Sequence, residues 1–293
     1  MQGARAVAER IRSVGNIGKV CRAMEAVSAT KMRRAEEAQA ASRAFAAQAA
    51  QLMALLGAQP AAGVLHPLLS RHDHGRPAMV LVTPDRGLTG GLGRALIVYA
   101  MERARDLGSD VAWIAIGRRG AQFLGRHPDP VLVASFDRIA DVPTRDDWVP
   151  PLELIRDDFL VGDFRSVHMV YPPYRSPDGA RVGMMKLLPI ELEPDRRLAA
   201  SSLTFEPNAD EVFEEVLERL LELRVYQAIV EAKASEHLAR MVAMRNAAAA
   251  TDDIVSGLTL TYNKWRQADI TAELLDITGG AEALRQDPSA GVR

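Results

Sequence analysis

The chain has 293 residues, of which 48% are hydrophobic and only 5% aromatic, and its formal net charge of −2 argues against a general nucleic-acid binder. Its one cysteine, Cys21, excludes an internal disulfide framework and suits a reducing compartment. No run of roughly 18 apolar residues occurs, so we expect no membrane-spanning helix, and the first residues predict neither a signal peptide nor a transit peptide.

Proline divides the chain into two helical ends and a different middle. Fifteen of the sixteen prolines lie between Pro60 and Pro207, and the sixteenth is Pro288. Because a proline in a helix interior costs about 3 kcal/mol, the proline-free ends predict long helices over residues 4–56 and 208–287. The first helix has nine basic and four acidic residues and therefore a charge of +5. The second has eight basic and fifteen acidic residues and therefore a charge of −7. This difference in sign favours pairing of the two helices.

One face of the first helix is marked by apolar residues at three- and four-residue spacing. The members of this face are Ile11, Val14, Ile17, Val20, Met24 and Val27. Gly15 and Gly18 interrupt the helix and are expected to allow close approach of another helix. The basic cluster at residues 31–34 is either a solvated face or a contact with an acidic partner.

The middle of the chain alternates between short apolar runs and helical stretches. The expected buried strands cover residues 78–83, 111–116, 131–135, 166–171 and 185–192, and the expected helices cover residues 91–107, 117–126 and 150–161. This alternation predicts an α/β layer domain whose sheet is mostly parallel. The turn-rich segment 172–183 is expected to be a hairpin or a loop.

Two segments of the middle were considered for chemistry. Residues 83–93 (TPDRGLTGGLG) follow a strand and open a helix, where a phosphate-binding loop would lie. Their spacing fits neither common phosphate motif and no lysine follows the glycines, so a tight strand-to-helix turn is favoured. His66, His72 and His74 lie close together in a loop without a second ligand cluster, which favours a surface loop over a metal site. No catalytic arrangement is found.

Several segments together resemble the gamma subunit of F-type ATP synthase. Residues 10–14 (RIRSV) and 19–34 (KVCRAMEAVSATKMRR) resemble its N-terminal helix, and residues 85–92 (DRGLTGGL) its glycine-rich turn. Residues 234–245 (ASEHLARMVAMR), 262–273 (YNKWRQADITAE) and 277–284 (ITGGAEAL) resemble its C-terminal helix. The resemblance covers nearly the whole chain, and the C-terminal motifs are highly specific.

The resemblance implies a fold and a role. In that family the two terminal helices form an antiparallel coiled coil, the central shaft of a rotary motor, and the middle is a Rossmann-like α/β domain. The shaft turns inside a ring of alpha and beta subunits, and the α/β domain contacts the epsilon subunit and the c-ring. ATP is made at the beta subunits, so the resemblance implies a noncatalytic chain without a cofactor or metal, peripheral to the cytoplasmic face of a bacterial membrane.

The resemblance also assigns coupling positions. Arg266 and Gln267 match the pair that contacts the beta subunits, and Thr271 and Glu273 match nearby coupling positions. Met24 matches a coupling position on the N-terminal helix, with ordinary coiled-coil packing as the alternative. The chain departs from the family pattern at Cys21, Thr89, Trp265 and Asp269, of which the last two lie beside the Arg266–Gln267 pair.

The resulting division of the chain has four parts. They are an N-terminal shaft helix (1–57), an α/β domain (58–207), a C-terminal shaft helix (208–287) and a tail (288–293). We expect a rotor subunit that couples proton flow through the c-ring to ATP synthesis or hydrolysis. The rival hypotheses are an α/β enzyme that binds a nucleotide at residues 83–93 with coiled-coil arms for oligomerisation, and a purely structural coiled-coil scaffold.

Overall fold

The computed structural model describes residues 2–57, 66–127, 131–174, 182–191, 206 and 208–286. The expected tail at 288–293, residues 175–181 of the expected loop and residue 192 of the last expected strand lie outside these residues. The chain divides into two compact units, Val27–Ala243 and the pair of segments Met1–Ala26 and Met244–Arg293. Two long helices, α1 (Gln2–Gly57) and α5 (Ala209–Gln286), each contribute to both units. Among the described helices, none has the length and apolarity that crossing a bilayer requires.

The larger unit is built on a five-stranded sheet of order β3-β2-β1-β4-β5. Its strands are β1 (Arg76–Val82), β2 (Ala112–Ile116), β3 (Val131–Phe136), β4 (Phe164–Tyr171) and β5 (Gly183–Leu188). The first four are parallel, and β5 runs antiparallel to β4. The 3-10 turn η2 (Pro67–Leu69) precedes β1, and the connecting helices are α2 (Leu92–Leu107), α3 (Arg118–Leu124) and α4 (Arg145–Val161). The expected mostly parallel α/β domain is confirmed.

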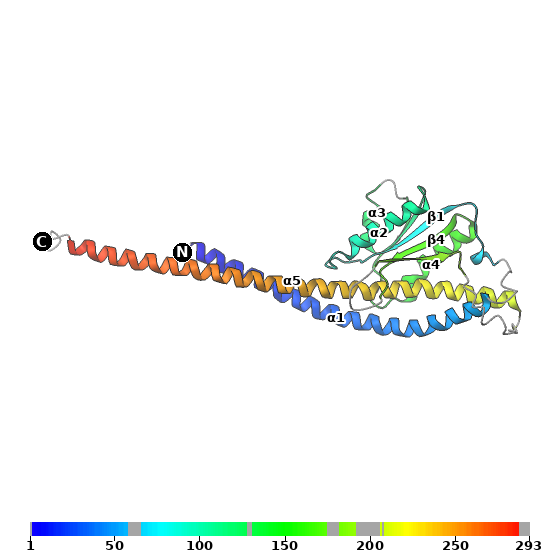
Figure 1. Ribbon diagram of the computed structural model, residues 1–293, viewed down its shortest axis with the longest axis horizontal. Helices are drawn as coiled ribbons and strands as arrows, with labels where there is room; N and C mark the ends of the chain where they lie inside the picture. The colour runs from blue at the N-terminus through cyan, green and yellow to red at the C-terminus, as the bar shows by residue number, and fades with distance from the viewer. Residues whose placement is uncertain are drawn as a thin grey trace. The chain divides into compact units, whose positions relative to one another are not determined.

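Alternating side chains give the sheet two buried faces. On β1, Val80 and Val82 point to a core shared with α4 and α5, whereas Met79 and Leu81 point to a core shared with α2 and α3. Figure 1 shows these helix layers on opposite sides of β1 and β4. Because β1 is covered on both faces, its sequence is a continuous apolar run without alternation.

The expected start of α4 at residue 150 is wrong. The helix begins at Arg145, where the Asp147 carboxylate accepts hydrogen bonds from the Thr144 amide (2.8 Å) and hydroxyl (3.0 Å). Pro150 and Pro151 therefore lie inside the helix, and not in its first turn. The helix continues through them because the carbonyls that lose a donor lie near its N-terminal end, where water can reach them.

Two of the expected buried strands are edge strands. Among the described strands β3 pairs with β2 alone, and its Val131 and Val133 side chains are 46% and 37% exposed. The last strand covers Gly183–Leu188, shifted from the expected 185–192. Pro189 follows it and has no N–H to donate, so the ladder to β4 ends there.

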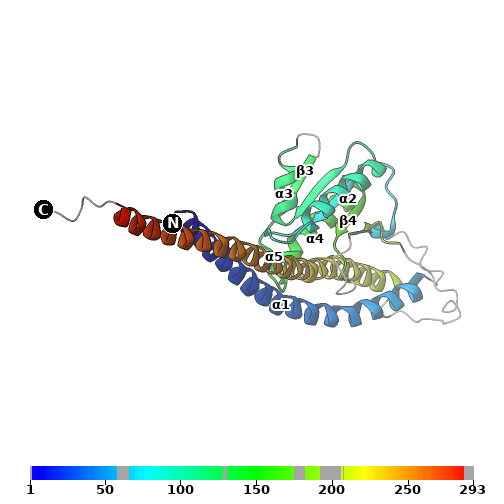
Figure 2. The same ribbon diagram turned by 60° about the vertical axis from the view of Figure 1, so that its left-hand side comes forward.

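The smaller unit pairs the first part of α1 with the C-terminal half of α5 in antiparallel directions (Figures 1 and 2). A Cβ atom on Gly18 would lie 2.7 Å from the Thr251 hydroxyl, so Gly18 does allow close approach. A Cβ atom on Gly15 would meet nothing within 4 Å, and the same expectation is wrong there.

The expected apolar face of α1 is also partly wrong. Ile17, Val20 and Val27 are more than half exposed, at 53%, 58% and 56%. Where burial in α1 is described, its buried positions are small or polar residues spaced by multiples of a helical turn, namely Gly18, Cys21, Ser28, Ala35 and Gln39. Close helix packing selects small side chains, whereas a search for bulky apolar residues finds the neighbouring face.

Candidate functional site

In the larger unit, α5 buries a run of ionisable side chains against the ends of the strands. Five of them, Glu231, Lys233, Glu236, His237 and Arg240, are each less than 9% exposed. Burying a charge is expensive unless it is paired and hydrogen-bonded. Each of these side chains has a hydrogen-bond or ion-pair partner, and the partners come from the loops of the sheet and from α5 itself.

The first contact joins α5 to the glycine-rich turn after β1. The Lys233 ammonium lies 3.1 Å from Asp85 Oδ2 and 3.5 Å from Glu236 Oε2, and Arg240 Nη2 donates to Glu236 Oε1 at 2.5 Å. Arg240 Nε also donates to the Gly87 carbonyl at 3.4 Å. The other Asp85 oxygen accepts from the Arg118 amide at 3.0 Å, so the turn is fixed to α3 and α5 together.

The second contact joins α5 to α1 through Asp141. His237 Nε2 lies 2.8 Å from one Asp141 oxygen, and Lys31 Nζ lies 2.8 Å from the other. Burial would raise the pKa of Asp141, but the hydrogen bond from Lys31 and the nearby His237 outweigh it and lower that pKa. The basic cluster at 31–34 is therefore partly an internal contact, since Lys31 pairs within the chain.

The protonation state of His237 follows from its two neighbours. Burial lowers its pKa, although Asp141 acts in the opposite direction. Arg240 Nη1 lies 3.2 Å from His237 Nδ1, and arginine can only donate, so Nδ1 is the acceptor. His237 is thus neutral, with its proton on Nε2 and donated to Asp141.

The third contact fixes the segment after β4. Tyr174 is buried, its amide donates to Glu231 at 3.3 Å and its carbonyl accepts from Gln39 at 3.2 Å. Its hydroxyl hydrogen-bonds Glu36 on α1, and Ser235 donates to the Pro172 carbonyl at 2.9 Å. These contacts join α1, α5 and the sheet through polar groups that are satisfied inside the unit.

The crevice in which open α/β sheets bind ligands is filled by α5. Such sites lie at the carboxyl ends of the strands where the strand order reverses, which in this sheet is between β1 and β4. Ala232, Lys233 and Glu236 of α5 line that place with Thr83 and Pro84, and they leave a cavity of only ≈ 10 Å³. A nucleotide does not fit in this crevice.

Residues 83–93 instead form the tight turn that the sequence favoured. Leu88 and Gly90 both have positive φ angles, of 64° and 56°. The turn also packs on Gly117, where a Cβ atom would lie 1.9 Å from the Thr83 carbonyl oxygen. Gly117 is therefore required for the close approach of the two strand ends.

Two histidines of the segment before β1 make contacts within the folded chain. His66 Nδ1 accepts from the Leu68 amide at 3.2 Å, and the His72 ring packs edge-on against Phe159. Within the part of the chain that the structure describes, no three His, Cys, Asp or Glu side chains are grouped so that they could hold a metal ion.

The coupling positions expected on α5 all lie in the smaller unit and are exposed. Arg266, Gln267 and Glu273 are exposed, and Thr271 is exposed while its hydroxyl donates to the Gln267 carbonyl at 2.9 Å. Met24 on α1 is half-buried. These positions are not gathered into one internal site, since four lie on α5 beyond Trp265, which packs opposite Gly3 near the start of α1.

Beyond that point α5 continues without α1 beside it and exposes large apolar side chains (Figure 2). Exposed large apolar residues in the C-terminal half of α5 are Ile254, Leu260 and Trp265 up to that point, and Ile270, Leu274, Leu275 and Ile277 beyond it. Apolar residues exposed in such number mark a surface for a partner.

Sequence reasoning missed the buried charges of α5 and their partners. Lys233, Glu236, His237 and Arg240 recur at three- and four-residue spacing, which was a readable signal of one helix face. Nothing in the sequence shows that Asp85 and Asp141, 148 and 96 residues away from Lys233 and His237, meet this face.

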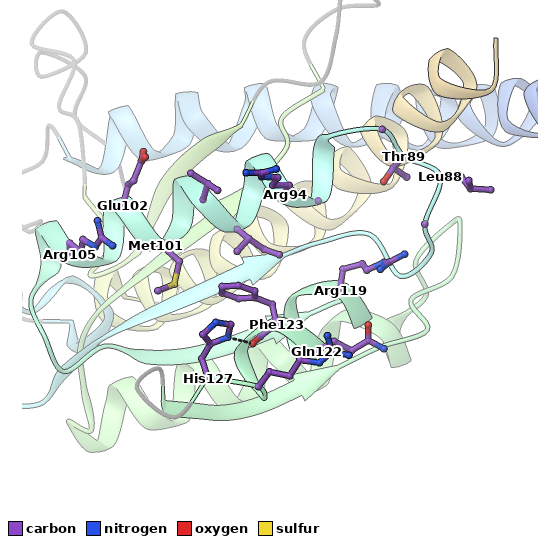
Figure 3. Close-up of a pocket in the computed structure, with 16 residues that line it drawn as sticks. Leu88, Thr89, Arg94, Met101, Glu102, Arg105, Arg119, Gln122, Phe123 and His127 are labelled. Atoms are coloured by element: carbon purple, nitrogen blue, oxygen red, sulfur yellow. Dashed lines mark hydrogen bonds between the residues drawn. The ribbon is translucent and has the colours of Figure 1, made fainter. Parts of the chain in front are cut away.

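A larger pocket lies between α2, α3 and the glycine-rich turn, on the other face of the sheet (Figure 3). It has a volume of ≈ 730 Å³. Arg94 and Met101 of α2 and Arg119 and Phe123 of α3 contribute to its lining.

Comparisons with known proteins agree with this geometry. A family model described as ATP synthase matches residues 3–284. The ATP synthase gamma chain of Dehalococcoides mccartyi (strain CBDB1) is 38% identical over 292 residues, which cover 97% of this chain and 100% of the relative.

Among solved structures, a chain of the Euglena gracilis mitochondrial ATP synthase (OSCP/F1/c-ring, rotational state 3) has a TM-score of 0.68 at 16% identity, covering 100% of this chain and 98% of its own. A chain of the Tetrahymena thermophila mitochondrial ATP synthase central stalk and c-ring has a TM-score of 0.57 at 21% identity, covering 78% and 99%.

Proposed function

Since the chain belongs to the ATP synthase gamma-chain family, we propose that it works as the rotor shaft of an F-type ATP synthase, without a catalytic site of its own. It couples proton flow through the c-ring to ATP synthesis or hydrolysis at the beta subunits. Its partners are the alpha and beta subunits, the epsilon subunit and the c-ring, and it works at the cytoplasmic face of a bacterial membrane. No cofactor is required of this chain.

The observation that carries the proposal is the exposed C-terminal half of α5. Its apolar side chains and its polar positions, Arg266, Gln267, Thr271 and Glu273, are uncovered within this chain. A surrounding ring of subunits would cover them. Arg266 presents a planar guanidinium suited to a carboxylate of a beta subunit.

Coupling follows from asymmetry. A helix presents different side chains in each direction, so each rotor orientation makes different contacts with the three catalytic subunits. A contact that is stronger in one conformation of a beta subunit shifts that subunit towards it. A nearly complete shift between two states needs about 5.5 kcal/mol of differential contact free energy.

The larger unit supplies the connection for torque in this proposal. Its polar contacts join α1 and α5 to the sheet, through the partly exposed set Lys31–Asp141–His237 and the largely buried pair Asp85–Lys233. The functional parts are the two shaft helices (1–57 and 208–287), the α/β domain between them and the tail at 288–293.

Rotation tests this function directly. The chain, with Cys21→Ser and Arg86→Cys, would be assembled with its alpha and beta subunits, and a probe would be attached at the exposed position 86. We expect ATP to drive stepwise, one-directional rotation of the probe that stops when ATP is withdrawn. A stationary probe in a complex that still turns over ATP would contradict the rotor role.

A further inference from the structure

The pocket between α2 and α3 has a positive charge that the described residues do not balance (Figure 3). Arg94 and Arg105 line it from α2, Arg119 and Arg126 line it from α3 and the residues after it, and Glu102 is the one carboxylate in the lining. Within the described ranges, none of these four arginines forms an ion pair. Four like charges around one cavity repel one another, so the arrangement favours a bound anion.

Three other arginines of the same unit do form ion pairs. Arg103 on α2 pairs with Asp106 at 3.0 Å, Arg118 with Asp137 at 3.4 Å and Arg219 with Glu222 at 2.8 Å. These paired arginines serve as a comparison for the four that line the pocket, for which no carboxylate partner occurs among the described residues.

The floor of the pocket is apolar. Ile97, Met101 and Phe123 are half-buried there against the core beneath α2 and α3. The Phe123 and His127 rings lie 4.4 Å apart, and His127 Nδ1 is held by the Phe123 carbonyl at 2.8 Å. Figure 3 shows the Phe123 ring between the two helices, where it offers a planar ligand a face for stacking.

The Arg119 guanidinium lies close to the glycine-rich turn. A Cβ atom on Gly87 would lie 2.6 Å from Arg119 Nη2, so the glycine leaves room for the guanidinium. The Gly87 carbonyl is in turn the acceptor for Arg240 of α5. A ligand that engages Arg119 would therefore touch a turn that is also fixed to α5.

We propose that this pocket binds a polyphosphate-bearing anion, with the phosphates between Arg94 and Arg119 and any planar ring of the ligand over Phe123. Arginine forks match phosphate oxygens in pairs. The volume of ≈ 730 Å³ falls in the range of small-molecule sites, about 300–1,000 Å³. The site is separate from the crevice that α5 fills, and the proposal goes beyond the rotor function and does not rest on it.

The test is calorimetric binding to the full-length chain with two probes, inorganic tripolyphosphate and ADP. We expect both to bind, and the Arg94→Gln, Arg119→Gln double variant to bind each at least about tenfold more weakly, the factor for one lost charge-assisted contact. The matched control is Arg103→Gln with Arg219→Gln, which removes the same charge from arginines already paired outside the pocket. Its affinities should stay within about twofold of the unmodified chain, because the pocket is unchanged.

The two probes also separate the possible sources of the phosphate. If Phe123→Leu weakens ADP alone, the pocket recognises a nucleotide; if it weakens neither and the probes bind equally, the polyphosphate chain alone is recognised. Both results support the proposal. It is overturned if neither probe saturates in the millimolar range, or if the control variant loses as much affinity as the pocket variant. Binding of a polyglutamate peptide without binding of either phosphate would also overturn it and assign the pocket to an acidic protein segment.

Discussion

Lys233 holds its ammonium group between two carboxylates, Asp85 and Glu236, with only 9% of its side chain exposed. Lys233→Met keeps the length of the side chain but leaves Asp85 buried without its cation. Removing one member of a buried pair costs about 3–5 kcal/mol. We expect a loss of this size in the free energy of unfolding of the full-length chain, measured with urea.

The control for this change is Arg103→Met. It also removes a cation from an ion pair, but the Arg103 side chain is 41% exposed and its pair with Asp106 is at the surface. Such pairs contribute about 0–1 kcal/mol. Equal losses in the two variants would show that the buried contacts of α5 have no special role.

The lowered pKa of His237 predicts how the free energy of unfolding changes with pH. Burial lowers its pKa in the folded chain, whereas in the unfolded chain the pKa is about 6.5. At a pH between these two pKa values, the unfolded state binds more protons than the folded state. The contribution of His237 to the free energy of unfolding is therefore fully present above about pH 6.5 and decreases as the pH falls below it. One group contributes a slope of at most about 1.4 kcal/mol per pH unit.

His237→Gln should remove this contribution, because glutamine does not titrate. His66 and His168 also have pKa values lowered by burial, so the unmodified chain and the variant must be compared at each pH. We expect the difference in unfolding free energy, measured with urea between about pH 7.5 and 5, to change with pH. A difference that stays constant would mean that the ring near Asp141 and Arg240 does not titrate differently in the folded chain.

At the scale of elements, Gly15 and Gly18 of α1 offer a paired comparison. Leucine at position 18 would push into Thr251, and such overpacking costs about 1–3 kcal/mol. Leucine at position 15 meets open space and gains up to about 1 kcal/mol of helix propensity. Hydrogen exchange of α1 amides in the full-length chain should thus accelerate in Gly18→Leu and slow in Gly15→Leu. The same response in both variants would contradict the observed packing.

The elements that could be predicted are those with a strong local signal. Absence of proline indicated α1 and α5, and continuous apolar runs indicated β1 and β2, because strands covered on both faces need no alternation. The start of α4 at Arg145 was not predicted, although Thr144 and Asp147 have the spacing of a capping box three residues apart. The edge position of β3 was missed because strand order depends on contacts between distant segments.

The candidate site was less predictable than the fold, and for a related reason. The exposed positions Arg266 to Glu273 came from a motif, and a motif can be read within one helix. The buried set around Lys233 and His237 needs Asp85, Asp141 and Tyr174, which are brought to α5 by the folded sheet. The face of α1 was misread because its close contact with α5 uses Gly18, and not the bulky Ile17 and Val20 beside it.

At the scale of the whole molecule, the proposed rotor function predicts that a variant of the shaft can impair coupling without changing nucleotide binding. Arg266 is exposed and would contact a neighbouring subunit, not a nucleotide. Losing one buried, charge-assisted contact across an interface costs about 2–5 kcal/mol. Arg266→Ala should therefore reduce steady-state ATP hydrolysis and ATP-driven proton pumping by about tenfold or more in the reconstituted complex. Nucleotide affinity at a single beta site should stay nearly unchanged, because the residue would touch no ligand.

Lys264→Ala is the matched control for that measurement. Lys264 is also an exposed cation on α5, but it precedes Arg266 by two residues and so lies on nearly the opposite side of the helix. If coupling depends on the direction in which a charge points, the control should keep most of its turnover and pumping while Arg266→Ala loses both. Comparable losses in the two variants would mean that net charge on the shaft matters, and not its position. Normal turnover and pumping with Arg266→Ala would remove the basis for assigning coupling to Gln267, Thr271 and Glu273 as well, because all four positions were identified by the same motif.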